Sequence, residues 1–248
     1  MPLELTKDQI DDLREIHLVC TQLHTEFVII GATAYKLYFG DDHRFTEDID
    51  VVIALDLDAF SEFARRLEAA EWERKPAREN RWRSRRGSYF DILPAGPQLR
   101  LDKQIVWPES EFVMNLIGFD HVFSEAQIHQ IVPDFSIKAV PPHVLALTKI
   151  ISFMDDPQRR AKDLGDIQSL LARYEEESDR IFDDLVFEAA LPDIGLANAF
   201  LLGLDLAKLC TAEERNIVNT FLLRFTDDRD DDPFVARLGA FKKGFEHS

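Results

Sequence analysis

The pattern of the sequence changes at Pro141-Pro142, and this change constrains the fold more than any other feature. Before it, short apolar runs typical of strands alternate with segments of helical spacing. The sequence predicts an α+β chain, with a small mixed sheet and flanking helices over residues 1–139 and an all-α domain over residues 140–248. After it, the predicted elements are helices, over residues 142–154, 158–174, 178–189, 194–209, 212–225 and 233–244.

The first part of the chain predicts a definite order of elements. An opening helix begins after Thr6, which forms the pattern of a capping box with Gln9. A short apolar run at residues 27–30 is typical of a buried strand and ends in Gly31. Further helices are predicted over residues 32–39 and 57–70, and further strands over residues 48–53, 81–85, 88–93, 112–117 and 135–139.

Two carboxylates share one face of the predicted strand at residues 48–53. Asp48 and Asp50 are two positions apart, and side chains at this spacing point to the same side of a strand. Like charges so close together are destabilising unless a cation neutralises them. Hard oxygen ligands suit Mg²⁺ or Mn²⁺ rather than zinc. A solvated strand end is the alternative for this Asp-x-Asp pattern on its own.

A third carboxylate and a glycine complete the candidate site. Asp91 lies among apolar residues of a later strand, where an acid needs a partner; it would ligate a second ion and accept a proton from an attacking hydroxyl. Gly31 stands between a strand and a helix, whose first N–H groups attract phosphate, and Thr33 adds a hydroxyl donor. The ordered combination predicts a metal site beside a phosphate-binding helix start.

This order of motifs resembles the DNA polymerase beta-type nucleotidyltransferase superfamily, and within it the AbiEii toxin-like group. Residues 31–34, Gly-Ala-Thr-Ala, are similar to that group's Gly-Gly-Thr-Ala element. Residues 44–50 match its Arg-x-[Ser/Thr]-x-Asp-Ile-Asp element. Residues 146–149 and 160–166 are similar to its second block, Lys … Arg-x-[Arg/Lys]-Asp-x-x-Asp. The resemblance covers residues 26–171.

The resemblance implies a nucleotidyltransferase fold and an enzyme that moves a nucleoside monophosphate from a nucleoside triphosphate to an acceptor hydroxyl, releasing pyrophosphate. The positions of Asp48, Asp50 and Asp91 match the catalytic, magnesium-binding acids of the superfamily. The helical domain would contribute to nucleotide and acceptor binding. The implied nucleotide-binding residues are Gly31, Ala32, Thr33, Lys149 and Asp163.

One of these residues departs from the family motif, and two others have an alternative interpretation. Ala32 replaces the usual Gly or Ser, and an alanine cannot donate a hydroxyl to phosphate. Lys149 lies in an otherwise apolar helix, where a lysine that extends its ammonium to the rim is the other interpretation. For Asp163 the other interpretation is an ordinary charged helix face.

The charge of the chain leaves the acceptor open. With 29 basic and 46 acidic residues the net charge is −17, which disfavours non-specific binding to nucleic acid. The AbiEii resemblance implies tRNA or another cellular target as acceptor, whereas an acidic chain favours a small cationic acceptor of the aminoglycoside type. A catalytically silent nucleotide-binding module is a third hypothesis, suggested by Ala32. RNA is favoured by one basic stretch, made of Arg74, Lys75, Arg78, Arg81, Arg83, Arg85 and Arg86.

The remaining features concern location and partners. Cys20 and Cys210 each lie in an apolar helical pattern and are expected to be buried, reduced thiols. No stretch approaches the roughly 20 apolar residues that a membrane span needs, and the first residues lack the pattern of a signal peptide. We therefore expect a cytoplasmic protein that does not engage membranes. The resemblance implies a nucleoside triphosphate and a cognate antitoxin as partners.

Overall fold

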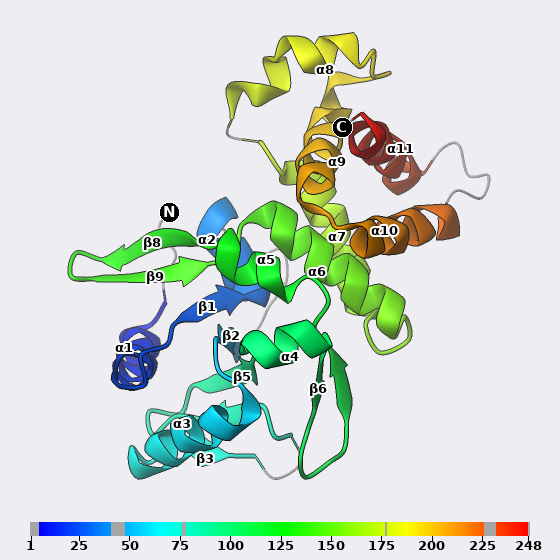
Figure 1. Cartoon of the computed structure of the whole chain (residues 1–248). Helices are drawn as coiled ribbons and strands as arrows, with labels where there is room; N and C mark the ends of the chain where they lie inside the picture. The colour runs from blue at the N-terminus through cyan, green and yellow to red at the C-terminus, as the bar shows by residue number, and fades with distance from the viewer. Residues whose placement is uncertain (1–4, 41–47, 76–77, 177, 226–231, 248) are drawn as a thin grey trace. The chain divides into compact units, whose positions relative to one another are not determined.

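The computed structural model divides into two compact units, Met1–Pro141 and Pro142–Ser248 (Figure 1). It describes residues 5–40, 48–75, 78–176, 178–225 and 232–247. The first unit combines a sheet with helices, and the described elements of the second are helical. The predicted fold class, a small mixed sheet with flanking helices followed by a helical region, is confirmed.

In the first unit the described residues form a seven-stranded sheet in the order β3-β4-β5-β2-β1-β9-β8. Strand β2 runs antiparallel to β1 and parallel to β5, and β9 runs parallel to β1, so the sheet is mixed. Its strands are β1 (Phe27–Ile30), β2 (Asp48–Ile53), β3 (Glu73–Arg74), β4 (Arg81–Arg83), β5 (Tyr89–Pro94), β8 (Gln127–Val132) and β9 (Phe135–Ala139). A separate ribbon pairs β6 (Gln104–Val106) with β7 (Val113–Asn115).

The helices of this unit are held by caps and by apolar faces. The predicted capping box is confirmed: Thr6 accepts a hydrogen bond from the Gln9 backbone N–H at 3.2 Å, and the Gln9 side chain accepts one from Thr6 at 2.9 Å. Helices α1 and α3 lie side by side (Figure 1). The helices are α1 (Lys7–Gln22), α2 (Gly31–Phe39), α3 (Leu57–Ala69), α4 (Pro97–Asp102) and α5 (Phe119–Ser124).

Strands β3, β6 and β8 were missed by the sequence pattern because they bury little. Both residues of β3 are exposed, and only the central residue of β6 is buried. Strand β8 lies at the edge of the sheet and has no buried residue. An edge strand needs no apolar face, so it lacks the alternation that identifies a central strand.

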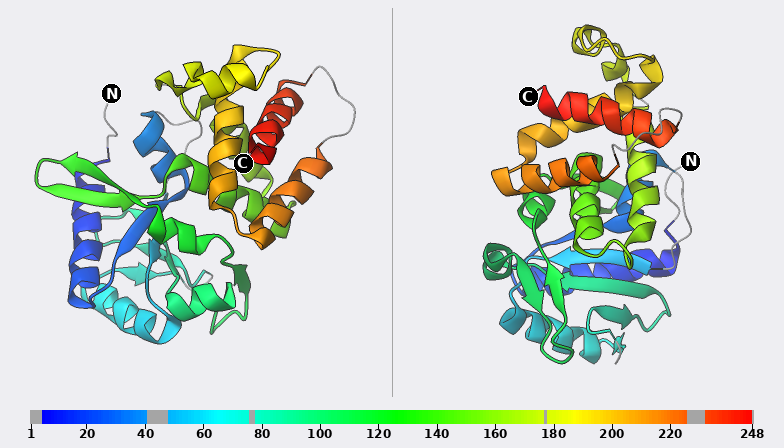
Figure 2. Two further views of the ribbon diagram at one scale, coloured as in Figure 1. Left: turned by 45° about the horizontal axis from the view of Figure 1, so that its top comes forward. Right: turned by 90° about the vertical axis from the view of Figure 1, so that its right-hand side faces the viewer.

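In the second unit, helices α9 and α11 approach so closely that their backbones nearly touch (Figures 1 and 2). A Cβ atom added to Gly203 would lie 2.1 Å from the Phe241 carbonyl oxygen, and one added to Gly244 would lie 2.0 Å from that of Phe200. Both glycines are therefore required by the crossing. The helical elements are α6 (Pro142–Asp155), α7 (Ala161–Arg173), η1 (Asp179–Phe182), α8 (Asp184–Glu188), η2 (Ile194–Leu196), α9 (Ala197–Leu209), α10 (Ala212–Arg224) and α11 (Pro233–Glu246).

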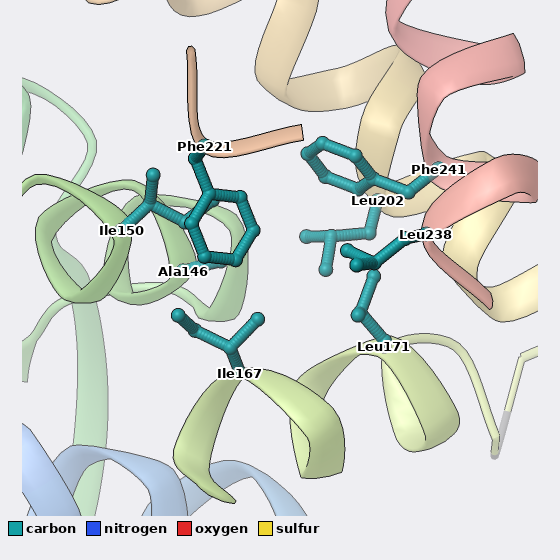
Figure 3. Close-up of a pocket in the computed structure, with 8 residues that line it drawn as sticks. All are labelled: Ala146, Ile150, Ile167, Leu171, Leu202, Phe221, Leu238 and Phe241. Atoms are coloured by element: carbon teal, nitrogen blue, oxygen red, sulfur yellow. The ribbon is translucent and has the colours of Figure 1, made fainter. Parts of the chain in front are cut away.

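Figure 3 shows how apolar side chains from five helices of this unit converge. Ile150 comes from α6, Ile167 from α7, Leu202 from α9, Phe221 from α10 and Phe241 from α11. All of these side chains are 2% exposed or less. They form the centre of the helical core, with no polar atom among them to orient a ligand.

The two cysteines and the apolar character of the helices also bear on the sequence predictions. Cys20 is a buried free thiol, as expected, whereas Cys210 is free but only half-buried at the end of α9. Burial raises the pKa of each thiol to about 12. Across the described ranges, no helix has both the length and the apolar character needed to cross a membrane.

Candidate active site

The parallel pairing of β2 with β5 brings three carboxylates to one face of the sheet. In this register Asp50 lies directly beside Asp91, and Asp48 stands two positions before Asp50 on the same face. The residues between them point the other way: Ile49 and Phe90 are 2% and 0% exposed. Because the apolar face is fixed in the core, the acids are fixed on the opposite face. The structure thus places together the three acids singled out in the sequence.

The start of α2 lies against one of these acids. Gly31 opens the helix with a positive φ of 67°, and a Cβ atom there would overlap the carboxylate of Asp50. Asp50 therefore lies at a helix N-terminus, where the helix dipole favours negative charge. The next two residues, Ala32 and Thr33, are buried at 6% and 5% exposure. The close approach explains why residue 31 is a glycine, both in backbone angle and in space.

A guanidinium group joins the cluster from the neighbouring strand. Arg81 on β4 lies opposite Asp91 and donates to it with Nε at 2.8 Å and Nη2 at 2.9 Å, a bidentate pair. The same Nη2 also donates to Asp48. The hydrogen bond to Asp91 and the negative charges of all three acids raise the pKa of Arg81 further above its ordinary value. Arg81 is thus a counter-cation of the cluster in this structure.

Sequence reasoning missed this role of Arg81, although a signal was present. The turn at Gly87 separates the two predicted strands, and folding the chain back on itself there places residue 81 opposite residue 91. Its basic neighbours in sequence instead place Arg81 in the basic stretch. Cross-strand pairing of opposite charges identifies it as part of the site.

The chemical type of the three carboxylate ligands suits a hard divalent cation. Their arrangement in this structure does not yet suit one. Three carboxylates from neighbouring positions of two strands are the ligands that Mg²⁺ or Mn²⁺ takes. In the part of the chain that the structure describes, however, no three His, Cys, Asp or Glu side chains stand ready to hold a metal ion. Arg81 already binds oxygens of Asp48 and Asp91. A cation would therefore need the Arg81 contacts to be rearranged.

The basic stretch that favoured RNA is largely neutralised within the unit. Arg85 and Arg86 bind Glu15 of α1 at 2.6 Å and 3.0 Å, and Arg86 also binds the fully buried Asp12 at 2.7 Å. Arg74 binds Glu109. Arg85 and Arg86 tie helix α1 to the β4–β5 hairpin, and Arg74 ties β3 to a loop, so these three arginines serve the structure rather than form an open basic surface.

Both tryptophans beside this stretch are core residues. Trp72 is 2% exposed and Trp82 is 0% exposed. The Trp72 ring packs on Phe90 with centroids 5.1 Å apart, and its indole N–H donates to Glu15 at 2.9 Å. Both rings therefore pack in the core and are not exposed to stack on a nucleic-acid base.

The second group of predicted residues lies in the helical unit. Lys149 on α6 is 7% exposed, and its ammonium lies 2.8 Å from Asp163 and 2.6 Å from Asp166 on α7. Arg160 adds a hydrogen bond to Asp163 at 2.7 Å. Lys149 therefore does not extend to a solvated rim, and neither acid is part of an exposed helix face. The sequence had identified Lys149 and Asp163, but it missed the part that Asp166 and Arg160 play around them.

A family comparison identifies the class of protein. The model of the family described as nucleotidyl transferase AbiEii toxin, type IV TA system, matches residues 12–243. The chain belongs to the AbiEii nucleotidyltransferase toxin family. The resemblance seen in the motifs is confirmed, and this AbiEii protein is an enzyme that transfers nucleotidyl groups. Among proteins with curated descriptions, none has a sequence that matches it.

Three solved structures are distantly similar to the AbiEii protein. An antigenic nucleotidyltransferase-like protein from Paracoccidioides brasiliensis is 16% identical, with a TM-score of 0.47 over 95% of this chain and 94% of that one. JHP933 from Helicobacter pylori is 14% identical, with a TM-score of 0.38 over 97% and 92%. ANT(2")-Ia in complex with adenylyl-2"-tobramycin is 10% identical, with a TM-score of 0.38 over 88% and 99%. The family model, not these similarities, decides the assignment.

Part of the AbiEii-like motif lies outside the described residues. Residues 44–47, which carry its Arg-x-[Ser/Thr]-x portion, are not described, whereas Asp48 and Asp50 are. In this AbiEii protein the structure therefore describes that element from Asp48 onward.

Proposed function

We propose that this AbiEii protein moves a nucleoside monophosphate from a nucleoside triphosphate to an acceptor hydroxyl and releases pyrophosphate. The acceptor oxygen attacks the α-phosphorus, the bond to the pyrophosphate oxygen breaks, and Asp91 takes the proton of the hydroxyl. One observation carries the proposal: Asp50 and Asp91 lie side by side in the β2–β5 register, with Asp48 on the same face.

The three acids are the proposed ligands of Mg²⁺ or Mn²⁺. When bound, such an ion neutralises phosphate charge and polarises the reacting oxygens. The negative face of the sheet attracts the cation, and Gly31 leaves Asp50 the space it occupies. This charge neutralisation and positioning are most of what nucleotidyl transfer requires.

The nucleotide-binding residues remain part of the proposal. Gly31, Ala32 and Thr33 form the start of α2, which supplies backbone N–H groups to a phosphate. In the helical unit we propose that Lys149 binds a nucleotide phosphate, with Asp163 holding its ammonium in place. A buried lysine whose charge is oriented by carboxylates is pre-set for such a contact, since little side-chain freedom is lost on binding.

For the acceptor, we propose tRNA or another cellular target, in keeping with the toxin–antitoxin description of the family. A cognate antitoxin is then the proposed partner, and the cytoplasm the proposed location. A small cationic acceptor is the second candidate. It is favoured by the net charge of −17 and by the pairing of Arg74, Arg85 and Arg86 with acids, which leaves less positive surface for RNA.

Labelled nucleoside triphosphates test the proposal directly. Each is incubated with the protein and Mg²⁺ or Mn²⁺, against total tRNA, cell protein and aminoglycosides, and the label is followed on each acceptor. Transfer should fall at least about 100-fold in Asp50→Asn, because a positioned charge is lost. Asp58→Asn, the same change at an exposed acid of α3, should transfer normally.

The silent-module hypothesis predicts a different pattern. A module without activity would still be stabilised against heat by nucleotide, in proportion to RT ln(1 + [L]/Kd), yet label no acceptor. If the triphosphate stabilises the protein in the presence of metal and no acceptor becomes labelled, binding without transfer is the better account. If neither stabilisation nor label appears, nucleotide use itself is wrong.

A further inference from the structure

We propose that Arg81 is a built-in competitor of the divalent cation: its guanidinium holds Asp48 and Asp91 until metal binding displaces it. This inference rests on the proposed function, because it concerns the same metal site. It assigns to Arg81 a positioning role, since Arg81 acts on the reaction through the two acids. The cluster would thereby stay partly neutralised and assembled in the absence of metal.

The contacts of Arg81 divide into a strong pair and a weaker link. Two nitrogens bind the two oxygens of Asp91 at 2.8 Å and 2.9 Å, whereas one nitrogen alone reaches Asp48. Bidentate pairing of guanidinium with carboxylate is the stronger arrangement. The contact with Asp48 is therefore the one that metal binding breaks first. Asp48 is then released to the ion first, and the bidentate pair with Asp91 opens as the Arg81 side chain moves away.

The position of Arg81 makes this exchange feasible. Its strand is fixed by Trp82, which is fully buried, while the Arg81 side chain is 25% exposed and can leave toward solvent. The side chains of Asp48 and Asp91 are 25% and 17% exposed, so all three charges face the same partly solvated space. An arginine keeps its positive charge under all ordinary conditions, so it leaves the acids only by moving.

The competition predicts opposite effects on stability and on metal affinity. Replacing Arg81 by Gln removes a positive charge from three acids that lie close together, which lowers the melting temperature of the metal-free protein. The same change removes a positive charge that repels the incoming ion and frees the Asp48 oxygen. Affinity for Mn²⁺ should therefore rise about tenfold or more, and added Mn²⁺ should raise the melting temperature more than in the wild type. Damage to the fold alone would lower both the melting temperature and the Mn²⁺ affinity.

Arg83 provides a matched control on the same strand. It lies two positions after Arg81, on the same face, opposite Tyr89 instead of Asp91. Its acidic partner is Glu73, at 3.9 Å and away from the cluster. Arg83→Gln should leave the Mn²⁺ affinity unchanged. Arg81→Lys keeps the positive charge but loses the bidentate contact. The Mn²⁺ affinity of this variant should therefore lie between those of the wild type and Arg81→Gln.

The test is a Mn²⁺ titration followed by the electron paramagnetic resonance signal of the free ion, together with melting curves with and without Mn²⁺. Asp50→Asn marks which binding belongs to the cluster. The proposal is supported if Arg81→Gln binds Mn²⁺ about tenfold more tightly through Asp50, including the case in which only the variant binds measurably. Should Arg81→Gln not fold, the Arg81→Lys affinity decides in the same direction.

Three other results overturn the proposal, and they differ in whether the metal site itself also fails. If the wild type and both Arg81 variants bind Mn²⁺ equally, the metal site stands and the competition is wrong. If none of them binds Mn²⁺ in an Asp50-dependent way, the metal part of the proposed function fails, and the competition fails with it. A weaker affinity in Arg81→Gln would show that Arg81 assists the ion rather than competes with it.

Discussion

The carboxylate of Asp50 lies where the side chain of residue 31 would begin: a Cβ atom on Gly31 would be 2.1 Å from Asp50 Oδ2. No real Cβ atom sits so close to an oxygen, so a side chain at residue 31 and the observed place of Asp50 are mutually exclusive. The position of an acid proposed to bind metal is thus set by the absence of a side chain on a neighbouring element.

Gly31→Ala should therefore impair the site through Asp50. The added Cβ must displace the carboxylate or the start of α2, and the φ of 67° is itself strained for alanine by about 1–2 kcal/mol. We expect a loss of transfer of about 100-fold or more, because catalytic groups displaced by about an ångström lose rates of this order. Initial rates of labelled nucleotide transfer measure it.

Gly87→Ala separates the two causes. Gly87 has a φ of 94°, so alanine is strained there as well, but its Cβ would meet only an Arg83 side-chain nitrogen at 3.9 Å. This variant should lose stability to a similar degree and keep most of its transfer activity. Equal losses of activity in the two variants would show that backbone strain, not the contact with Asp50, explains the glycine.

Gly203→Ala should destabilise the helical unit by about 2–3 kcal/mol or more, as overpacked sites do. The reason is the 2.1 Å approach of its Cβ to the Phe241 carbonyl, which forces α9 and α11 apart. Gly239→Ala is the control, because Gly239 lies in α11 and its Cβ would have nothing within 4 Å. Alanine there should be neutral or stabilising by up to about 1 kcal/mol. Urea unfolding measures both; similar losses would refute the close crossing.

The sequence predicted those parts of the site that depend on one element at a time. The faces of β2 and β5 follow from alternation, since Ile49 and Phe90 must be buried, and this is enough to place the three acids on one side. The predicted capping box at Thr6 likewise depends only on residues three apart. Local geometry determines such features, so pattern alone recovers them.

Contacts between elements could not be predicted from the sequence pattern. Arg81 was counted in a basic stretch because its neighbours in sequence are basic, yet its partners are the acids of adjacent strands. Arg86 was counted with it, although its partners Asp12 and Glu15 are more than 70 positions away on α1. The net charge of a segment says nothing of what lies across from it. For this reason a run of basic residues in the sequence does not by itself indicate an RNA-binding surface.

Lys149 should prove to be a structural residue as well as the proposed phosphate ligand. Lys149→Met leaves two buried carboxylates, of Asp163 and Asp166, without the ammonium they share. Breaking a buried ion pair in this way typically costs about 3–5 kcal/mol. Lys162→Met, the same change at an exposed position of α7, should have little effect. Unfolding in urea gives both values.

A double-mutant cycle checks that the cost comes from the uncompensated charge. Asp166→Asn introduced into Lys149→Met removes one of the two carboxylates that have lost the Lys149 ammonium, so the double variant should be more stable than the sum of the single effects predicts. A coupling of about 1 kcal/mol or more is expected for groups in contact. Additive effects would mean that Lys149 and Asp166 do not stabilise each other, despite the 2.6 Å distance.

Asp205 should make the stability of the helical unit depend on acid pH. Burial alone would raise its pKa, but hydrogen bonds from Arg180, Lys208 and Tyr174 outweigh burial and lower it from 3.8 to about 2. A lowered pKa in the folded state contributes stability that is present above pH 4 and is lost as the pH falls toward 2. Between pH 5 and pH 3 the loss from this group should be about 1 kcal/mol.

Asp205→Asn isolates this contribution. Asparagine does not titrate, so the difference in unfolding free energy between the wild type and the variant should be largest at pH 5 and shrink by about 1 kcal/mol at pH 3. Urea unfolding at each pH measures these differences. A gap between wild type and Asp205→Asn that does not narrow would show that the bonds from Arg180, Lys208 and Tyr174 fail to favour the ionised carboxylate.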